Sequence, residues 1–394
     1  MANSKSVDQD AVLRARTLLL GSGRRSLREE VQAYRVLAQV SPRAYLGKLA
    51  TALVSYAYAR EFQGRPEIVF ALCGEAVEAA RKIGVAEPRR TEVLVRALGA
   101  YERELFAAGR REEGLAVCRE AADVGREGCE RGQVDSRAYG SGRLAVVLAE
   151  EGRHAAAAEV AGREVDDSFW ALTRWAAELD AAGEHGAASE AFGRLVDVQR
   201  GKLAKGEGSA AVTVWALVRH SRMAGTVGAD AVRAEALGLL RELGESGERR
   251  GWSDLLSFWT TLLALSSRSL EPVDSPAPAF GSHVSDWSPD VRDTYAAGLD
   301  ELARAAAEPD TPLAELAVVQ HRLAIRSALC HGGPRVRVEQ RLAPLFDRSV
   351  ELARELGDPA WLARALTDRA TFLVAVKRYR EAYAQFREAM GLFR

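Results

Sequence analysis

The sequence predicts an all-α protein built from repeated pairs of antiparallel helices. Apolar residues recur at steps of three or four through nearly all of the 394 residues, the spacing of a helix with one apolar face. The period-two alternation of a half-buried strand is not sustained, and the sequence contains no Asn-Gly or Asp-Gly hairpin turn. Short turns interrupt the helical pattern at similar intervals. These observations together favour a solenoid of stacked helix pairs.

The turns carry the repeat. Gly64, Gly109, Gly152 and Gly183 lie 45, 43 and 31 residues apart, the range of helix-pair repeats, and Lys377 takes the same place near the end. Glycine at such a turn suits a left-handed helix cap. Five residues after four of these turns comes a small residue, which allows paired helices to approach closely: Gly114, Ala157, Ala188 and Ala382.

This pattern resembles the tetratricopeptide repeat, whose motif has the form W-x2-L-G-x2-Y…G-x-Y-x2-A-x3-F-x2-A. The last unit matches it with Leu366, Ala370, Leu373, Tyr379, Ala382, Phe386 and Ala389. Other units depart from it, with Ala161 where Phe is usual and Val69 where Ala is usual. The stretch 33–53 is similar to the opening of actinobacterial arrays attached to signalling NTPases and regulators. The resemblance covers roughly residues 30–265 and 335–394 and implies a right-handed superhelix.

Three parts are expected along the chain. Residues 1–267 form an N-terminal helical array, and residues 291–394 form a C-terminal helical lobe that ends in one repeat. Between them, residues 268–290 contain Pro272, Pro276, Pro278 and Pro289, which exclude a continuous helix. This segment is either an inert spacer or a loop that folds over a groove.

Composition limits the partners. The 54 Lys and Arg residues balance 55 Asp and Glu residues, so bulk charge gives no reason to expect direct nucleic-acid binding. The uncharged run 255–267 is too short for a membrane span, which needs about 20 residues. The opening MANSKSVDQDA has no apolar core of a secretion signal. The four cysteines are scattered without CxxC spacing, so we expect a cytoplasmic protein with reduced thiols.

No catalytic or metal-binding pattern was found. HExxH, GxSxG, GxGxxG and the P-loop motif are missing, and the six histidines lie far apart. Cys330 and His331 form a close Cys/His pair, but no second pair completes a zinc site. We therefore expect neither catalytic residues, nor a metal, nor a cofactor.

A candidate groove comes from the register of the repeat. In the tetratricopeptide superhelix the second position of each first helix faces the concave side, which places Arg96, Tyr139, Trp170 and Trp215 there. The same register puts Tyr58, Arg103 and Phe106 on concave positions of earlier units. Aromatic and arginine side chains suit peptide capture, because they bury much area and bind carboxylates. The alternative is that these aromatic residues fill gaps between repeats as core.

The last helix, within 377–394, carries more apolar residues than one neighbouring helix covers. Tyr383, Phe386, Met390 and Phe393 are candidates for an interface, either with a second copy of the chain or back onto residues 291–330. The alternative is a frayed end without a partner.

Two functions fit this sequence. The first is a non-enzymatic scaffold or adaptor that binds a protein or peptide segment in an aromatic concave groove. The second is a ligand-responsive regulator, acting on a transcription factor or an NTPase, whose groove binds a small molecule or a signalling peptide. An open channel favours the scaffold, and a closed pocket favours the regulator.

Overall fold

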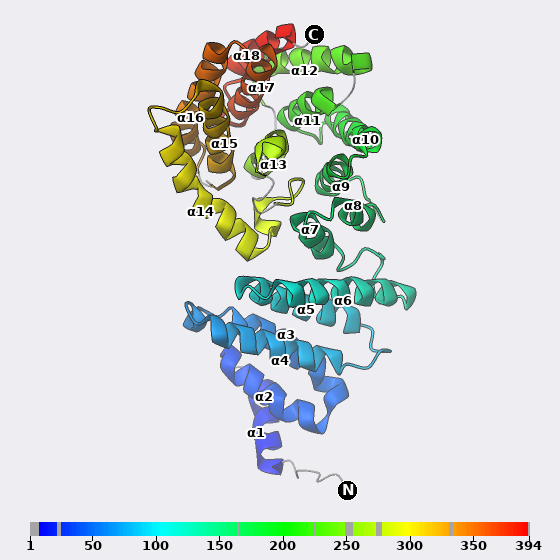
Figure 1. Ribbon diagram of the computed structural model, residues 1–394. Helices are drawn as coiled ribbons and strands as arrows, with labels where there is room; N and C mark the ends of the chain where they lie inside the picture. Colours follow the sequence, from blue (N-terminus) through cyan, green and yellow to red (C-terminus); the bar gives the residue numbers. More distant parts are fainter. Residues whose placement is uncertain are drawn as a thin grey trace. The chain divides into compact units, whose positions relative to one another are not determined.

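A computed structural model describes residues 8–21, 25–163, 165–223, 226–248, 255–272, 278–330 and 334–392. These residues form eighteen α-helices and three short 3₁₀ helices, and no strand occurs among them (Figure 1). Consecutive helices pack against each other as antiparallel pairs. The predicted all-α fold of stacked helix pairs is therefore confirmed. No helix in the described ranges combines the length and the apolar character needed to cross a membrane.

The chain divides into two compact units. Unit 1 comprises Met1–Ala145 with Ser288–Asp290, and unit 2 comprises Val146–Trp287 with Val291–Arg394. This division differs from the expected one, which placed the boundary at 268–290. The physical reason is that residues after 268 pack against helices that precede them, so that both sides of the proline-rich segment belong mainly to one unit. Each unit is described below by itself.

Unit 1 is a linear stack in which each helix contacts its neighbours in sequence. Contacts join successive helices from the first to the sixth, and α3 also contacts α5. Its apolar core includes Leu53, Ala76 and Leu98, all fully buried. The helices are α1 (Gln9–Leu20), α2 (Leu27–Val40), α3 (Pro42–Ala57), α4 (Pro66–Arg81), α5 (Arg90–Ala107) and α6 (Arg111–Glu130), with a 3₁₀ turn at Arg60–Phe62.

Unit 2 folds back on itself. Its last helix packs against α12, so helices far apart in sequence become neighbours, and α13 lies between α11, α15 and α17 (Figure 1). Its helices are α8 (His154–Gly162), α9 (Phe169–Ala181), α10 (His185–Ala204), α11 (Ala210–Met223), α12 (Thr226–Ser246), α13 (Leu255–Ser267), α14 (Pro289–Ala306), α15 (Leu313–Cys330), α16 (Arg335–Leu356), α17 (Pro359–Ala375) and α18 (Tyr379–Leu392). The short helix α7 (Gly142–Glu150) spans the division between the units, and 3₁₀ turns occupy Arg268–Leu270 and Val284–Asp286.

The predicted turns are confirmed. Gly64, Gly109, Gly152 and Gly183 all have positive φ, and Lys377 is the one described non-glycine residue that shares this conformation, with φ of 65°. At the last four of these five turns the residue after the cap donates its N–H to a carbonyl five positions back, at 2.8 to 2.9 Å. This is the Schellman pattern, which satisfies carbonyls left unpaired at a helix end. The same C-terminal cap therefore ends the first helix in each of these four pairs.

Small residues stand where helices cross closely. Ala157, Ala188 and Ala382 are fully buried, as their place in the repeat predicts. In α6 a Cβ added to Gly125 would lie 1.6 Å from the carbonyl oxygen of Tyr139, so the chain passes this helix at backbone contact. The close approach of the Tyr139 backbone to α6 therefore requires glycine at position 125.

The C-terminal helix finds its neighbours inside unit 2. Helix α18 packs against α17 and α12, and Phe386 is fully buried, while Tyr383 and Met390 are half-buried. The expectation that Phe386 remains available for a second copy or for residues 291–330 is wrong in this respect, because α12 covers the apolar face. Phe393 lies outside the described residues.

Candidate functional site

The predicted groove residues do not form one set, because they fall in both units. Unit 2 holds two of them, Trp170 and Trp215. Unit 1 holds the other five, which are Tyr58, Arg96, Arg103, Phe106 and Tyr139. We therefore examined the two groups separately.

In unit 2 the chain covers its own inner face. Trp215, expected to be exposed, is only 2% accessible, and its indole N–H donates to the carbonyl oxygen of Thr371 at 3.1 Å. The expectation of exposure is wrong, because α17 and α13 pack on α11. Trp170 is half-buried and meets the His283 ring edge-to-face, with 6.0 Å between ring centroids. Trp215 is therefore a core residue, which was the alternative to a place in the groove.

Described residues of the proline-rich segment, within 268–272 and 278–287, contact α9. The Arg268 guanidinium donates to the carbonyl oxygen of Ala177 at 2.9 Å, and Arg174 Nε donates to the Ser282 hydroxyl at 2.9 Å. Gly281 approaches so closely that an added Cβ would lie 2.7 Å from Cβ of Ala177. The described part of this proline-rich segment is therefore no inert spacer, because it folds onto the inner face of α9.

In unit 1, four of the five groove residues remain accessible, and three of them lie on or at the end of first helices of the repeat. Tyr58 is 48% exposed and donates its hydroxyl to Glu104 Oε1 at 3.2 Å. Burial of the hydroxyl, with the nearby charges of Cys73 and Glu104, raises the pKa of Tyr58. Arg96 and Arg103 are exposed along α5. Together they give unit 1 a polar surface with one aromatic anchor.

The remaining two groove residues of unit 1 differ in accessibility. Phe106 is fully buried, with the guanidinium of Arg111 5.3 Å from its ring centroid and Gly114 packed against its edge. The groove assignment of Phe106 is therefore wrong, because α6 covers it. Tyr139 is 38% exposed, and its carbonyl forms the close contact with α6.

A cleft of about 650 Å³ opens in the same unit, between α2, α3 and the residues that lead into α5. Its lining includes the apolar side chains of Ala52, Ile83 and Val93 together with charged and hydroxyl-bearing side chains. The cleft is lined by Leu27, Glu30, Tyr34, Arg43, Ala44, Gly47, Lys48, Thr51, Ala52, Ser55, Ile83, Glu87, Pro88, Arg89, Arg90 and Val93. Such a mixed lining offers a ligand both apolar contact and polar groups that fix its orientation.

The charges around this cleft are unequal. Four cationic side chains line it against the two carboxylates of Glu30 and Glu87. Arg43 pairs with Glu87, so that carboxylate is already engaged. Lys48 lies 5.3 Å from the ring centroid of Tyr45. Arg90 donates its Nε to the carbonyl oxygen of Ile83 at 3.2 Å, and its buried Nη1 has no partner among the described residues. Arg89 is paired as well, with Glu92 at 3.4 Å. Lys48 and Arg90 therefore stand against the single carboxylate of Glu30, which leaves one net positive charge in the cleft.

The sequence pattern missed this cleft. Its residues on α3 lie at 43, 44, 47, 48, 51, 52 and 55, a helical stripe of small residues with one arginine and one lysine. A stripe of small side chains on a helix signals either close packing or a hollow. The predicted groove was based on large aromatic residues instead, and a folded protein often buries such residues in its core.

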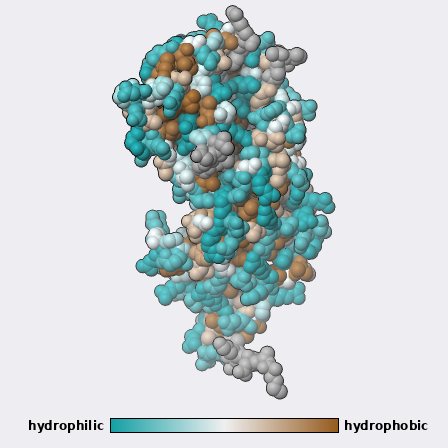
Figure 2. Space-filling view, in the orientation of Figure 1, coloured by the Kyte–Doolittle hydropathy of each residue, from teal (hydrophilic) through white to brown (hydrophobic). Residues whose placement is uncertain are grey.

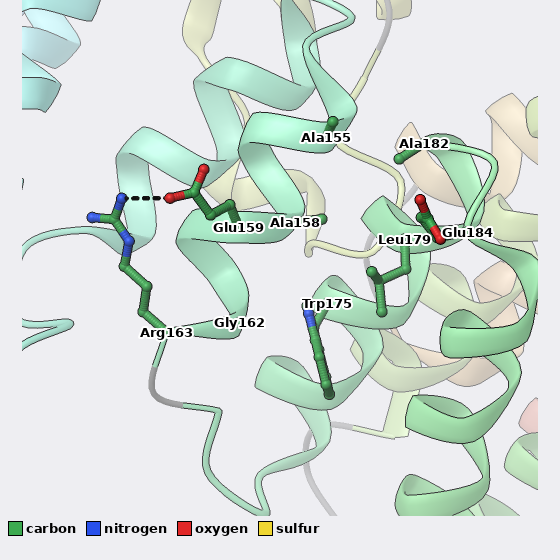
Figure 3. A pocket seen from close by; sticks show the side chains of 9 residues that line it. All are labelled: Ala155, Ala158, Glu159, Gly162, Arg163, Trp175, Leu179, Ala182 and Glu184. Carbon is green, nitrogen blue, oxygen red and sulfur yellow. Dashed lines mark hydrogen bonds and ion pairs between the residues drawn. The ribbon is translucent and has the colours of Figure 1, made fainter.

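A second hollow, of about 430 Å³, lies in unit 2 between α8 and α9 (Figure 3). The edge of the Trp175 indole stands against Gly162, where an added Cβ would lie 2.7 Å from Nε1. Its charged residues Glu159 and Arg163 are exposed and pair with each other at 3.1 Å. Among the residues that line this hollow, Glu184 is then the one ionisable side chain outside that pair, so the lining offers little charge to select a ligand.

No catalytic constellation emerges from the described side chains. No group of three or more His, Cys, Asp or Glu residues is arranged to hold a metal ion in the described ranges. Burial raises the pKa of the Cys330 thiol, which makes it a poorer nucleophile. In the view of Figure 2, hydrophilic residues cover most of the surface and hydrophobic ones form small groups.

Comparison with known proteins gives little beyond the helical repeat. No family model matches, and no curated protein matches. Among solved structures, a circular tandem repeat protein with novel repeat topology is 16% identical over 98% of this chain and 96% of its own, with a TM-score of 0.19. Nro1, described as a nuclear import adaptor, is 14% identical over 93% and 94%, also at 0.19. A Naa15/Naa10 structure bound to HypK-THB gives 13% identity over 98% and 68%, at 0.20. At such TM-scores the structures do not superpose on this chain as wholes.

Proposed function

We propose that this protein is a non-enzymatic scaffold of the tetratricopeptide type that binds an acidic peptide segment of a partner protein in the cleft of unit 1. The observation that carries the proposal is a cleft of about 650 Å³ whose lining combines apolar side chains with two cations, Lys48 and Arg90, that form no ion pair among the described residues. In unit 2, by contrast, the chain's own segments cover the corresponding inner positions. The open surface of unit 1 is therefore the better candidate.

The chemistry of the cleft selects an amphipathic acidic segment. Apolar side chains of the peptide fit against Ile83 and Val93, where burial is worth about 25 cal/mol per Å². Its carboxylates meet Lys48 and Arg90, the two cations of the lining that form no ion pair among the described residues. The Thr51 hydroxyl donates to the carbonyl oxygen of Gly47 at 2.9 Å, which leaves its oxygen free to accept from a peptide N–H.

Several features support the tetratricopeptide assignment. Four of the five turns share one hydrogen-bond pattern, and the small residues of the motif are buried between helices. Tyr58, Arg96 and Arg103 then extend the binding surface along first helices, as the repeat register predicts. In this proposal they contact the part of a longer peptide that leaves the cleft.

The test is a binding titration with three fluorescein-labelled peptides of equal length, one acidic and amphipathic, one neutral and one basic. We expect the acidic peptide to bind, and Lys48→Glu to weaken its binding at least tenfold. The matched control is Lys82→Glu at the end of α4, an exposed lysine that does not line the cleft. Equal binding by both variants, or preference for the basic peptide, would contradict the proposal.

A ligand-responsive regulator is the second candidate function. The observation in its favour is that the chain covers the inner face of unit 2, where Trp215 is buried and 278–287 packs on α9. A closed interior suits a small ligand better than a peptide. The titration described next bears on this alternative.

A further inference from the structure

The inner side of unit 2 contains three arginines near one another. Arg219 and Arg222 come from α11, and Arg364 comes from α17, beside the carboxylate of Asp368 on the same helix. We refer to these three as the inner arginine cluster. The helices that carry it lie against α13, and α11 contacts α17 directly (Figure 1).

Asp368 is fully engaged by its neighbours. It is 2% exposed; Arg222 Nη1 lies 2.9 Å from Oδ1, and the Ser266 hydroxyl donates to Oδ2 at 2.9 Å. His321 Nε2 lies 3.1 Å from Oδ2. Burial alone opposes ionisation, but Arg222, His321 and Ser266 outweigh it and lower the pKa of Asp368 to about 2. This carboxylate therefore neutralises Arg222.

The other two arginines lack such a partner. Among the described residues neither Arg219 nor Arg364 has a carboxylate within ion-pair distance, and Arg219 Nε is buried without a hydrogen-bond partner. Arg364 reaches the Ser269 hydroxyl at 3.5 Å and lies 5.6 Å from the ring centroid of Trp361. Burial, and then the positive charge of Arg222, lowers the pKa of both, that of Arg219 to about 10.

A further donor lies on α13. Trp259 is 1% exposed, and its indole N–H has no partner in the part of the chain that the structure describes. Buried polar groups are normally paired, so an unpaired N–H calls for an acceptor. Two cations without an ion pair call for an anionic one.

We propose that the inner arginine cluster is a binding site for a small phosphate-bearing dianion, held between α11 and α17 by Arg219 and Arg364. Neither guanidinium group forms an ion pair with a described residue, and the carboxylates of Asp180 and Asp368 offset their charge from beyond ion-pair distance. Two such cations suit the charge of a phosphate monoester or of inorganic phosphate. The planar donor fork of arginine suits phosphate oxygens. Each of these two side chains keeps part of its surface open to solvent, whereas Arg219 Nε is buried. This site is separate from the peptide cleft of unit 1 and does not depend on it.

A structural role for these arginines predicts a different outcome. Buried charges without partners destabilise a fold, and apolar residues of similar size usually replace them without loss. Arg219→Gln should therefore raise the melting temperature of the full-length protein in anion-free buffer, while it weakens phosphate binding. An arginine that stabilises the fold would lower the melting temperature when changed.

The experiment is a thermal-shift and calorimetric titration of the full chain with inorganic phosphate, phenyl phosphate and succinate, against sodium chloride of equal ionic strength. At a hundredfold excess over Kd, we expect phosphate or phenyl phosphate to raise Tm by about 5 to 10 °C. Stronger binding of phenyl phosphate assigns an organic monoester, and stronger binding of inorganic phosphate assigns the free ion. Arg219→Gln and Arg364→Gln should each weaken binding at least tenfold.

The control variant is Arg241→Gln, an exposed arginine on α12 that should leave both Tm and affinity unchanged. A response to phosphate no larger than the response to chloride overturns the proposal, and so does tighter binding of succinate. Unchanged phosphate affinity in both cluster variants overturns it as well, whatever their stability.

Discussion

Asp368→Asn should be the most destabilising single conservative change in the interior of unit 2. The wild-type carboxylate has a pKa of about 2 against 3.8 for a free Asp, a difference that corresponds to about 2 kcal/mol at neutral pH. The change also leaves Arg222 buried without its partner beside two other arginines, and breaking a buried pair costs about 3 to 5 kcal/mol. We therefore expect the free energy of unfolding to fall by about 3 to 5 kcal/mol.

The assay is urea unfolding followed by tryptophan fluorescence. All seven tryptophans lie at position 170 or later, so their emission reports on unit 2 and not on unit 1. The matched control is Glu388→Gln, which removes an exposed partner of Arg354 at 2.8 Å and should cost less than about 1 kcal/mol. If Asp368→Asn unfolds within about 1 kcal/mol of wild type, the reasoning about the buried pair is refuted.

The same carboxylate predicts a pH dependence. Because its pKa is lower in the folded protein than in the unfolded one, its contribution to stability is present above pH 3.8 and is lost as the pH falls through about 2. The wild type should lose stability in this window, and Asp368→Asn should lose less there. Parallel acid-unfolding curves for the two proteins would contradict the assignment.

Three further changes test the packing. Lys377→Gly should stabilise the protein by about 1 kcal/mol in urea unfolding, because Lys377 has a left-handed backbone that glycine adopts without strain; a loss of stability would contradict this. Gly125→Ala should destabilise unit 1 strongly, since its Cβ would lie 1.6 Å from a carbonyl oxygen, whereas Gly99→Ala on α5 meets nothing within 4 Å and should be neutral or stabilising by circular dichroism. Phe386→Ala should cost about 3 to 5 kcal/mol by tryptophan fluorescence, and a cost below about 1 kcal/mol would show that α12 does not cover it.

The sequence sufficed for features that local interactions determine. A turn glycine and the small residue five positions later act within one helix pair, so the positions of the turns at Gly109, Gly152 and Gly183 could be predicted. The last turn could be predicted too, although Lys377 stands where glycine is usual. Such signals depend on neighbouring residues and on backbone conformation, which a pattern records directly.

The prediction of the groove was wrong at positions whose exposure depends on helices distant in sequence. Trp215 and Thr371 are 156 positions apart, and no periodicity within either helix shows that α17 covers α11. Asp368 and Arg222 are 146 positions apart, so their pairing was equally hidden. The register predicts only that large side chains share one face of each first helix. Which of these faces the chain itself covers is a property of the tertiary fold.

The contact between α12 and α18 also bears on the order in which the chain is made. Unit 1 contains mainly contacts between sequence neighbours, so its helices can pair as they leave the ribosome. In unit 2, the side of α12 that faces α18 stays uncovered until α18, which carries Phe386, has been synthesised. At about 5 to 20 residues per second, the 146 residues from Ser246 to Leu392 take roughly 10 to 30 s. During that time the apolar side of α12 is exposed in the nascent chain, and a chaperone that recognises apolar segments can bind it.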